Sequence, residues 1–320
     1  MDSSQYAEYR PLMFSIAYRM TGSVSDAEDI VQEAFLRAGQ GSGAASPKAY
    51  LATITTRLAI DHLRSARVRR ESYVGTWLPD PIVGPGAGTA PGGTDPAELA
   101  ETSDSLSLAF LVLLESLGPA ERAVFLLREV FSYDYREISG ITGKTEAACR
   151  QVFTRARRRV DEGRPRFETS RAAGEELTAL FLAAADGGDM SSLLERLAPD
   201  VVFYGDSGGK GEVTLIAPVY GRGQVAGLIR VQVERTLQAG AVLAPSWVNG
   251  QPGLLAFDAD GGLIVVIALD VIDGQIQAIR VIANPDKLRH LGPVSRTWHL
   301  RWSELDHENG GVTPPDGAAS

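Results

Sequence analysis

Apolar residues recur every three or four positions through the first seventy residues, a spacing typical of amphipathic helices. Acidic residues lie in the first turn of a segment that starts near Ser25, and Ser25 followed by Glu28 is a capping-box pattern. Its apolar stripe consists of Ala27, Ile30, Val31, Ala34 and Phe35. Pro47 suits the first turn of a second helix. The residues of that helix expected to face a core are Leu51, Ile54, Leu58 and Leu63.

Residues 71–103 interrupt the helical pattern and are predicted to form a linker. The run GPGAGTAPGGTDP within it cannot hold a regular element, so this part should be flexible. The preceding WLPDP differs, because a Trp beside prolines is costly to leave in water. We expect Trp77 and Leu78 to dock on another part of the chain. The alternative is an untethered aromatic residue in a loop.

Residues 104–162 return to the helical pattern, and Tyr135–Val160 within them is predicted to be a short helix and a longer helix joined by a Gly-bounded turn. One face of the second helix is apolar and consists of Ala148, Cys149, Val152, Phe153, Ala156 and Val160. The opposite face carries Arg150, Gln151, Thr154, Arg155 and Arg158. This arrangement suits a helix that packs on a small core and presents donors to a DNA major groove. The alternative is an ordinary surface hairpin of helices with solvated arginines.

The hydrophobic pattern changes beyond about residue 170. Two helices, within EELTALFLAAADGGD and MSSLLERLA, are expected before a strand at VVFYG, and another helix is expected over Gly221–Leu237. The stretches SWVNGQPGLLAFD and GGLIVVIALDVIDGQIQAIRVI are typical of strands joined by Gly-containing turns. Helices followed by antiparallel strands indicate an α+β domain. The polar, Gly- and Pro-rich end of the chain, from about Gly310, is predicted to be disordered.

The composition is that of a soluble globular protein of two or three domains: 320 residues, 44% hydrophobic and 22% charged. A single cysteine, Cys149, excludes an intramolecular disulfide framework and any CxxC site, and its place on the apolar face favours a core role over a redox sensor. The sequence has no apolar stretch of membrane-spanning length, and its start is polar rather than that of a signal peptide. We therefore expect a cytoplasmic protein without a cofactor or a metal site.

Taken alone, the net charge of −9 argues against nucleic acid as a partner, but the basic residues are concentrated in two patches. The first basic patch, opposed only by Asp61, consists of Arg37, Lys48, Arg57, Arg64, Arg67, Arg69 and Arg70. The second, opposed only by Glu146, consists of Lys144, Arg150, Arg155, Arg157, Arg158 and Arg159. Nearby charges dominate under physiological screening, so an acidic chain with such patches can still bind phosphate.

Three segments together resemble the extracytoplasmic-function sigma factors of bacterial RNA polymerase. SDAEDIVQEAFLRA resembles the polymerase-binding helix of that family, PKAYLATITTRLAIDHLRSARVRR its promoter −10 segment, and Tyr135–Val160 its −35 reader. The remainder resembles a subgroup with a fused SnoaL-like domain of the NTF2-like cone fold. WLPDP, Asp206–Lys210 (DSGGK) and Asn284–Leu288 (NPDKL) resemble motifs of that subgroup, although Ser207 stands where a glycine is usual.

The resemblance implies a multidomain fold: two all-α helical domains, sigma-2 and sigma-4 with its helix-turn-helix, followed by an α+β cone domain. The expected boundaries are 1–70 for sigma-2, 71–103 for the linker, 104–165 for sigma-4, 170–290 for the SnoaL-like domain and 291–320 for a partly disordered tail. It also implies core RNA polymerase (its β′ and β subunits) and promoter DNA as partners, and a chain that is monomeric when free.

In this family the acidic helix docks on a coiled coil of the β′ subunit. The residues expected to bind polymerase are Asp26, Glu28, Asp29, Gln32, Glu33 and Phe35. The residues expected at the −10 region are Lys48, Arg57, Asp61, His62, Arg64, Arg67, Arg69 and Arg70. Relatives often carry Asn where this chain has Arg57, so base preference is expected to differ. The alternative for Arg57 is a surface pair with Asp61.

The residues expected to contact the −35 element are Lys144, Thr145, Arg150, Gln151, Thr154, Arg155 and Arg158, with Thr145 as a helix cap. The fused domain is expected to regulate the sigma domains by direct contact. The contact residues expected are Trp77, Leu78, Pro79, Asp206, Gly208, Gly209, Lys210, Asn284, Pro285, Asp286 and Lys287.

Catalysis is not expected, because no histidine lies within the predicted cone and most of its aspartates sit at turns. The sequence thus predicts a sigma factor regulated by its C-terminal domain. The alternative is a DNA-binding transcription regulator whose cone domain senses a small molecule or acts as an isomerase or cyclase.

Overall fold

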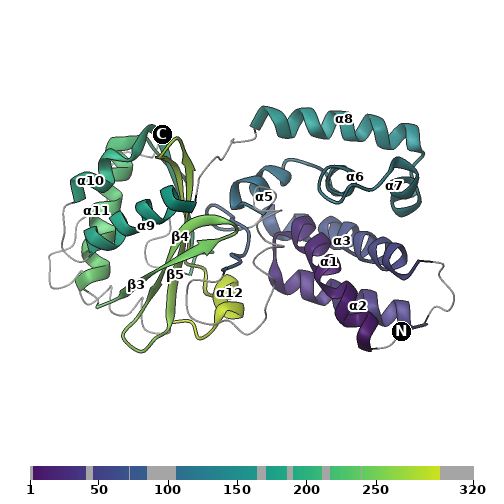
Figure 1. Cartoon of the computed structure of the whole chain (residues 1–320), viewed down its shortest axis with the longest axis horizontal. Helices are drawn as coiled ribbons and strands as arrows, with labels where there is room; N and C mark the ends of the chain where they lie inside the picture. Colours follow the sequence, from purple (N-terminus) through teal and green to yellow (C-terminus); the bar gives the residue numbers. More distant parts are fainter. Residues whose placement is uncertain are drawn as a thin grey trace.

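The computed structural model describes residues 3–40, 46–71, 73–84, 106–163, 171–185, 190–210, 217–238 and 240–295. The Gly/Pro-rich stretch of the predicted linker after Gly84 and the predicted tail lie outside these ranges. The chain folds into a helical half and a half built on a β-sheet, which lie side by side (Figure 1). None of the helices in the described ranges combines the length and apolar content that a membrane span needs.

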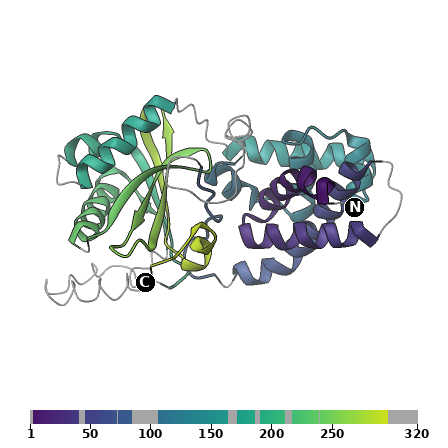
Figure 2. The same ribbon diagram turned by 60° about the horizontal axis from the view of Figure 1, so that its bottom comes forward.

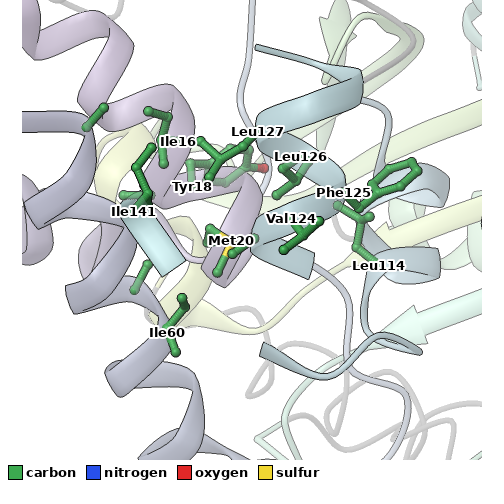
Figure 3. Close-up of a cluster of buried hydrophobic side chains, with 14 of the residues drawn as sticks. Ile16, Tyr18, Met20, Ile60, Leu114, Val124, Phe125, Leu126, Leu127 and Ile141 are labelled. Atoms are coloured by element: carbon green, nitrogen blue, oxygen red, sulfur yellow. The ribbon is translucent and has the colours of Figure 1, made fainter. Parts of the chain in front are cut away.

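The helical half contains α1 (Ser3–Thr21), α2 (Val24–Gln40), α3 (Pro47–Glu71), α5 (Leu108–Leu114), α6 (Pro119–Glu129), α7 (Tyr135–Thr142) and α8 (Glu146–Gly163). One hydrophobic core joins the first three of these helices to the last four. Figure 3 shows Tyr18 and Met20 of α1 beside Val124, Leu126 and Leu127 of α6. The two helical units therefore pack as one body in this arrangement.

A buried arginine reinforces the contact between α6 and α1. Arg122 donates from Nη1 to the Met20 carbonyl at 2.6 Å and to the Glu115 carboxylate at 2.7 Å. Burial lowers the pKa of Arg122 to about 9, which leaves its guanidinium charged at neutral pH. Because both acceptors are held in place by helices, this arginine fixes how the two units meet.

Local sequence explains where the helices begin and end. Asp134 caps α7 through a reciprocal capping box with Glu137, and Gly143 ends it in the left-handed conformation with φ of 69°. The prediction that Ser25 caps the acidic helix is wrong. That helix, α2, begins at Val24, and the Ser23 hydroxyl accepts from the Asp26 amide at 3.3 Å. Ser25 lies inside the first turn instead.

The second half is a six-stranded mixed sheet with the order β2-β1-β6-β5-β4-β3. Its strands are β1 (Leu197–Asp206), β2 (Val219–Tyr220), β3 (Val242–Val248), β4 (Gln251–Phe257), β5 (Leu263–Ile272) and β6 (Gln275–Ile282). β1 pairs in parallel with β6, and the other neighbours are antiparallel. The parallel pair is possible because β1 and β6 are far apart in the chain.

The two faces of the sheet are covered differently. α9 (Arg171–Ala185), α10 (Met190–Glu195) and α11 (Arg222–Gln238) pack on one face and bury an apolar core that includes Phe181, Leu254 and Leu269 (Figure 2). The opposite face packs Val266 and Ile282 against Leu78 before α5, Leu108 in α5, and Leu288 of the short α12 (Pro285–Leu288). The 3₁₀ turn η2 (Arg289–Leu291) follows. The second face therefore meets the helical half, and the predicted fold class, helical units followed by an α+β domain, is confirmed.

Candidate partner-binding surfaces

The acidic face of α2 is open to solvent, and several of its carboxylates are already paired within the chain. Glu28 accepts from Arg10 at 3.4 Å and Glu33 from Arg37 at 2.6 Å, while Asp29 and Gln32 are exposed. Exposed pairs of this kind contribute little to stability, so a basic partner could replace them.

The exposed large apolar side chain on α2 is Leu36, whereas the sequence had suggested Phe35. Phe35 is half-buried and packs against the core, whereas Leu36 is 58% exposed. Leu36 lies one position beyond the apolar stripe. Its exposure could have been predicted from the sequence, because an apolar residue outside the stripe does not face the core.

The adjacent helix α3 carries the first basic patch apart from Arg37, which lies in α2. Lys48 and Arg64 are exposed, and Arg64 pairs with Asp61 at 3.1 Å. His62 pairs with Asp26 of α2 at 3.1 Å. A residue expected at the −10 region therefore contacts a residue expected to bind polymerase. The side chains of Arg67, Arg69 and Arg70 lie outside the described residues.

Arg57 does not form the surface pair with Asp61 that the sequence allowed. Its guanidinium donates from Nε to the Ile141 carbonyl and from Nη2 to the Gly140 carbonyl, each at 2.9 Å. Both carbonyls lie in the last turn of α7, where helical carbonyls lack intrahelical partners and the helix dipole favours a cation. In this arrangement Arg57 therefore fastens α3 to the helix-turn-helix.

The helix α8 has the two faces that the sequence predicts. Cys149, Val152, Phe153, Ala156 and Val160 are buried, while the opposite face is exposed. The exposed residues are Arg150, Gln151, Thr154, Arg155, Arg157, Arg158 and Arg159. The Thr145 hydroxyl accepts from the Ala148 amide at 3.2 Å, as expected of a cap, and Lys144 is half-buried beside it.

Acids neutralise part of that exposed face. Arg150 pairs with Glu146 at 2.9 Å, and its guanidinium lies over the Tyr135 ring at 5.0 Å. Arg158 pairs with Glu162 at 2.9 Å. Pairs at this helical spacing contribute only a few tenths of a kcal/mol, about 0.3–0.5, so the arginines can exchange them for phosphates.

The segment 73–84 is ordered, and it joins the two halves around the buried carboxylate of Asp206. One Asp206 oxygen, Oδ2, accepts from the Leu78 amide and from Lys287 Nζ, each at 2.7 Å. The other, Oδ1, accepts from the Tyr73 hydroxyl, whose pKa is raised mainly by burial and then by the hydrogen bond to Asp206. Lys287 Nζ also donates to the Leu78 carbonyl and lies against the rings of Tyr73 and Trp77. We call this group of residues the buried junction.

Neighbouring loops complete the junction. Gly208 has φ of 59°, and a Cβ there would lie 2.3 Å from Asn284 Nδ2, so a glycine is required. Asn284 in turn donates to the Tyr73 hydroxyl at 2.9 Å. Lys210 pairs with Asp286 in the open rather than inside the junction. Gly209 lies against Val74, and Pro285 is half-buried.

Asp80 of WLPDP binds the first helical unit, a role that the sequence analysis missed. Its Oδ2 accepts from the Val24 amide at 2.8 Å and its own amide donates to the Gly22 carbonyl at 2.8 Å. The Tyr18 hydroxyl donates to the Asp80 carbonyl at 2.6 Å. Pro79 is buried beside it, and Trp77 packs so closely on Gly22 that a Cβ there would lie 2.7 Å from the ring. An Asp between prolines is ordinary turn chemistry, so no local pattern pointed to this contact.

Two further aspartates of the sheet domain have structural contacts. Asp258 accepts from the amides of Asp260 and Gly262, which is a turn. Asp270 is buried and accepts two hydrogen bonds from Arg280, at 2.8 and 3.0 Å. Among the described residues no group of three His, Cys, Asp or Glu side chains could hold a metal ion.

Comparisons with known proteins identify a sigma-factor region in each helical unit. The Sigma-70 region 2 family matches residues 5–69, and Sigma-70, region 4 matches residues 107–160. The ECF RNA polymerase sigma factor SigJ of Mycobacterium tuberculosis is 36% identical over 94% of this chain and 100% of its own length. A probable ECF RNA polymerase sigma factor of the same species, SigI, is 36% identical over 89% of this chain and 94% of its own.

A solved structure extends the similarity to the whole architecture. The crystal structure of Mycobacterium tuberculosis SigJ superposes with a TM-score of 0.71 and covers 92% of this chain and all of that one, at 36% identity. The similarity thus includes the sheet domain as well as the helices. The chain belongs to the extracytoplasmic-function (ECF) sigma factors of RNA polymerase.

Proposed function

We propose that this sigma factor binds polymerase, the −10 region and the −35 element through three surfaces, and that one further domain regulates this binding. Residues 1–70 (sigma-2) bind core polymerase and the −10 region, and residues 104–165 (sigma-4) bind the −35 element. Residues 170–290 regulate both through the buried junction. The chain acts in the cytoplasm, as polymerase does, and performs no catalysis of its own.

The acidic face of α2 is the proposed docking surface for the β′ subunit, with further contacts to β. Asp29 and Gln32 are exposed there, and Leu36 offers an apolar contact at the edge of the same face. A basic partner would gain charge-assisted hydrogen bonds without having to break a buried network. Leu36 takes the place that the sequence analysis gave to Phe35.

The proposed DNA contacts are the exposed donors of α3 and α8. On α8, Arg150, Gln151, Thr154 and Arg155 face away from the core, with Arg158 one turn further along. On α3, Lys48 and Arg64 are exposed, and Arg57 would contact the −10 strand after leaving α7. A lost bidentate Arg–base contact would cost about 1–3 kcal/mol.

The observation that carries the regulatory proposal is the engagement of Arg57 with α7. Promoter positions −35 and −10 lie about 25 base pairs apart, which is roughly 85 Å of duplex. Yet the −10 helix α3 touches the helix-turn-helix directly, through the bonds of Arg57 to Gly140 and Ile141. A chain that contacts both elements therefore has to separate α3 from α7. The arrangement seen is a closed one, and the fused domain holds it through segment 73–84.

Charge reversal on α2 tests the docking surface. Asp29→Lys with Glu33→Lys should abolish binding to purified core polymerase, measured by co-elution, because both positions would then repel a basic partner. Glu234→Lys with Asp260→Lys, two exposed acids of the sheet domain, is the matched control and should bind normally. Equal binding of both variants would refute the assignment of α2.

A further inference from the structure

The turn between β3 and β4 contains an asparagine in an unusual setting. Asn249 and Gly250 have φ of 51° and 74°, and Val248 pairs with Gln251, as in a two-residue hairpin turn. Asn-Gly is ordinary there, so the backbone alone implies nothing further. The β5–β6 hairpin has an equivalent turn, Asp273–Gly274, with φ of 50° and 72°. Asp273 is exposed, whereas Asn249 is only 2% exposed.

The side-chain amide of Asn249 is hydrogen-bonded at both ends. Its Oδ1 accepts from the Ile82 amide at 2.8 Å. Its Nδ2 donates to the Tyr18 hydroxyl at 2.8 Å and to the Leu106 carbonyl at 2.9 Å. Its backbone amide donates to the Ile82 carbonyl at 2.7 Å. A turn residue needs none of these side-chain bonds, because the hairpin is already closed by its own strands.

The three partners of that amide belong to three different parts of the chain. Tyr18 lies in α1 of sigma-2, Ile82 in the segment that follows WLPDP, and Leu106 just before α5 of sigma-4. Segment 82–84 continues along the edge of β3, where Val83 bridges Val248 and the Gly84 amide donates to the Trp247 carbonyl at 2.8 Å. Part of the linker after sigma-2 and a residue just before α5 therefore converge on this one turn.

We propose that Asn249 is a positioning residue through which the C-terminal domain holds sigma-2 and the start of sigma-4 in the closed arrangement. None of the DSGGK, NPDKL and WLPDP motifs contains it. The inference rests on the proposed regulatory function, since it names the residue that links the fused domain to both sigma units at once. Tyr18 and Leu106 are buried and Ile82 is half-buried, so removal of the Asn249 amide leaves polar groups unpaired where water reaches them poorly.

The experiment compares Asn249→Gly with Asp273→Gly in the full chain. Glycine accepts the left-handed backbone of both turns, so each variant keeps its hairpin and loses only a side chain. Amide hydrogen exchange followed by mass spectrometry reads peptides that cover residues 78–84 and 106–111. Small-angle X-ray scattering gives the radius of gyration.

In Asn249→Gly we expect amide protection in both peptides to fall by roughly a hundredfold, as the loss of three hydrogen bonds of ordinary net strength predicts, and the radius of gyration to rise. Asp273→Gly should change neither quantity. Equal protection and equal size in the two variants would overturn the proposal.

Asn249→Asp separates a positioning role from simple loss of stability. Asp tolerates the turn and can still accept from the Ile82 amide, but it places an oxygen against the Leu106 carbonyl. Exchange should therefore rise more at 106–111 than at 78–84. A uniform rise over the whole chain would mark mere destabilisation and contradict the proposal. Run-off transcription with the wild-type chain tests the sigma function separately, because its outcome does not depend on either exchange result.

Discussion

The buried junction and the exposed face of α8 use the same kinds of charged residue in opposite surroundings. At the junction, Asp206 and Lys287 are paired at 2.7 Å with almost no exposure. Asp206 also accepts from Tyr73 and Leu78, and Lys287 donates to the Leu78 carbonyl. On α8, Arg158 and Glu162 are paired at 2.9 Å with most of both side chains in water. A buried pair cannot lose one partner cheaply, whereas an exposed pair exchanges partners readily.

This difference separates the contacts that hold the parts of the chain together from the contacts that we propose for polymerase and DNA. Charges that hold the fused domain on sigma-2 are dehydrated and have several partners each. Charges proposed to meet polymerase and DNA are hydrated and paired only with near neighbours on their own helix. Whether a charged side chain is buried or exposed therefore indicates its role better than its residue type does.

The largest effect is expected from breaking the buried pair. Asp206→Ala removes the buried carboxylate that pairs with the Lys287 ammonium and accepts from the Leu78 amide, so it should cost about 3–5 kcal/mol of unfolding free energy. Lys210→Met breaks the exposed Lys–Asp pair between the same two loops and should cost less than about 1 kcal/mol. Denaturant titration of both variants measures the difference. Similar losses would show that burial does not separate the two pairs.

A smaller effect is expected at the partly exposed contact between α3 and α7. Arg57→Ala removes two charge-assisted hydrogen bonds to carbonyls and should destabilise the closed arrangement by about 1–2 kcal/mol. Arg64→Ala, which loses only an exposed pair with Asp61, is the control and should change the stability by less than about 0.5 kcal/mol. Hydrogen exchange in the last turn of α7 should increase in the first variant alone. No increase there would mean that Arg57 does not fasten the two units.

The carboxyl of Asp80 should make the contact between segment 73–84 and the first helical unit sensitive to pH. Burial raises its pKa above the ordinary value of 3.8, while Lys287, the Val24 amide and His290 act in the opposite direction. A raised folded-state pKa gives stability that is complete below pH 3.8 and is lost as the pH rises through the folded value. The advantage of the wild-type chain over Asp80→Asn should therefore shrink from acidic to neutral pH, in urea titrations at both. An advantage that grows with pH would contradict the predicted direction.

The smallest effect on stability is expected on α8. Arg158→Gln breaks an exposed pair with Glu162 and should change the unfolding free energy by less than about 0.5 kcal/mol. It should nevertheless weaken binding to duplex −35 DNA and lower the slope of log affinity against log salt by about 1. Fluorescence anisotropy over a salt series measures both. An unchanged salt slope would place Arg158 outside the phosphate contacts.

The sequence predicted the elements that depend on local pattern. The docking of Leu78 is confirmed too, although it was expected from the cost of leaving apolar residues in water. The two faces of α8, the cap at Thr145 and the strands β1 and β4–β6 follow from periodicity and turn chemistry, and all are present. These features involve residues that are close in the chain or obey a period that one element imposes.

The missed features depend on contacts between distant residues. The sequence around Asn249 predicts a hairpin turn. Its side-chain amide binds Tyr18 and Leu106, which lie far away in the chain. Arg57 has Asp61 within reach on its own helix but binds carbonyls of α7, some eighty positions away. α2 begins two residues earlier than predicted, because Ser23 and Asp80 accept the hydrogen bonds that Ser25 was expected to accept.

Run-off transcription at limiting sigma factor tests most directly whether the fused domain holds the sigma units closed. With purified core polymerase and a promoter that the chain recognises, Asn249→Gly should give more promoter-specific transcript than wild type, because a larger fraction of the chain is open. Asp273→Gly should match wild type, and adding Asp29→Lys with Glu33→Lys should remove the signal. Equal transcript from Asn249→Gly, Asp273→Gly and wild type would contradict a closed arrangement held by the C-terminal domain.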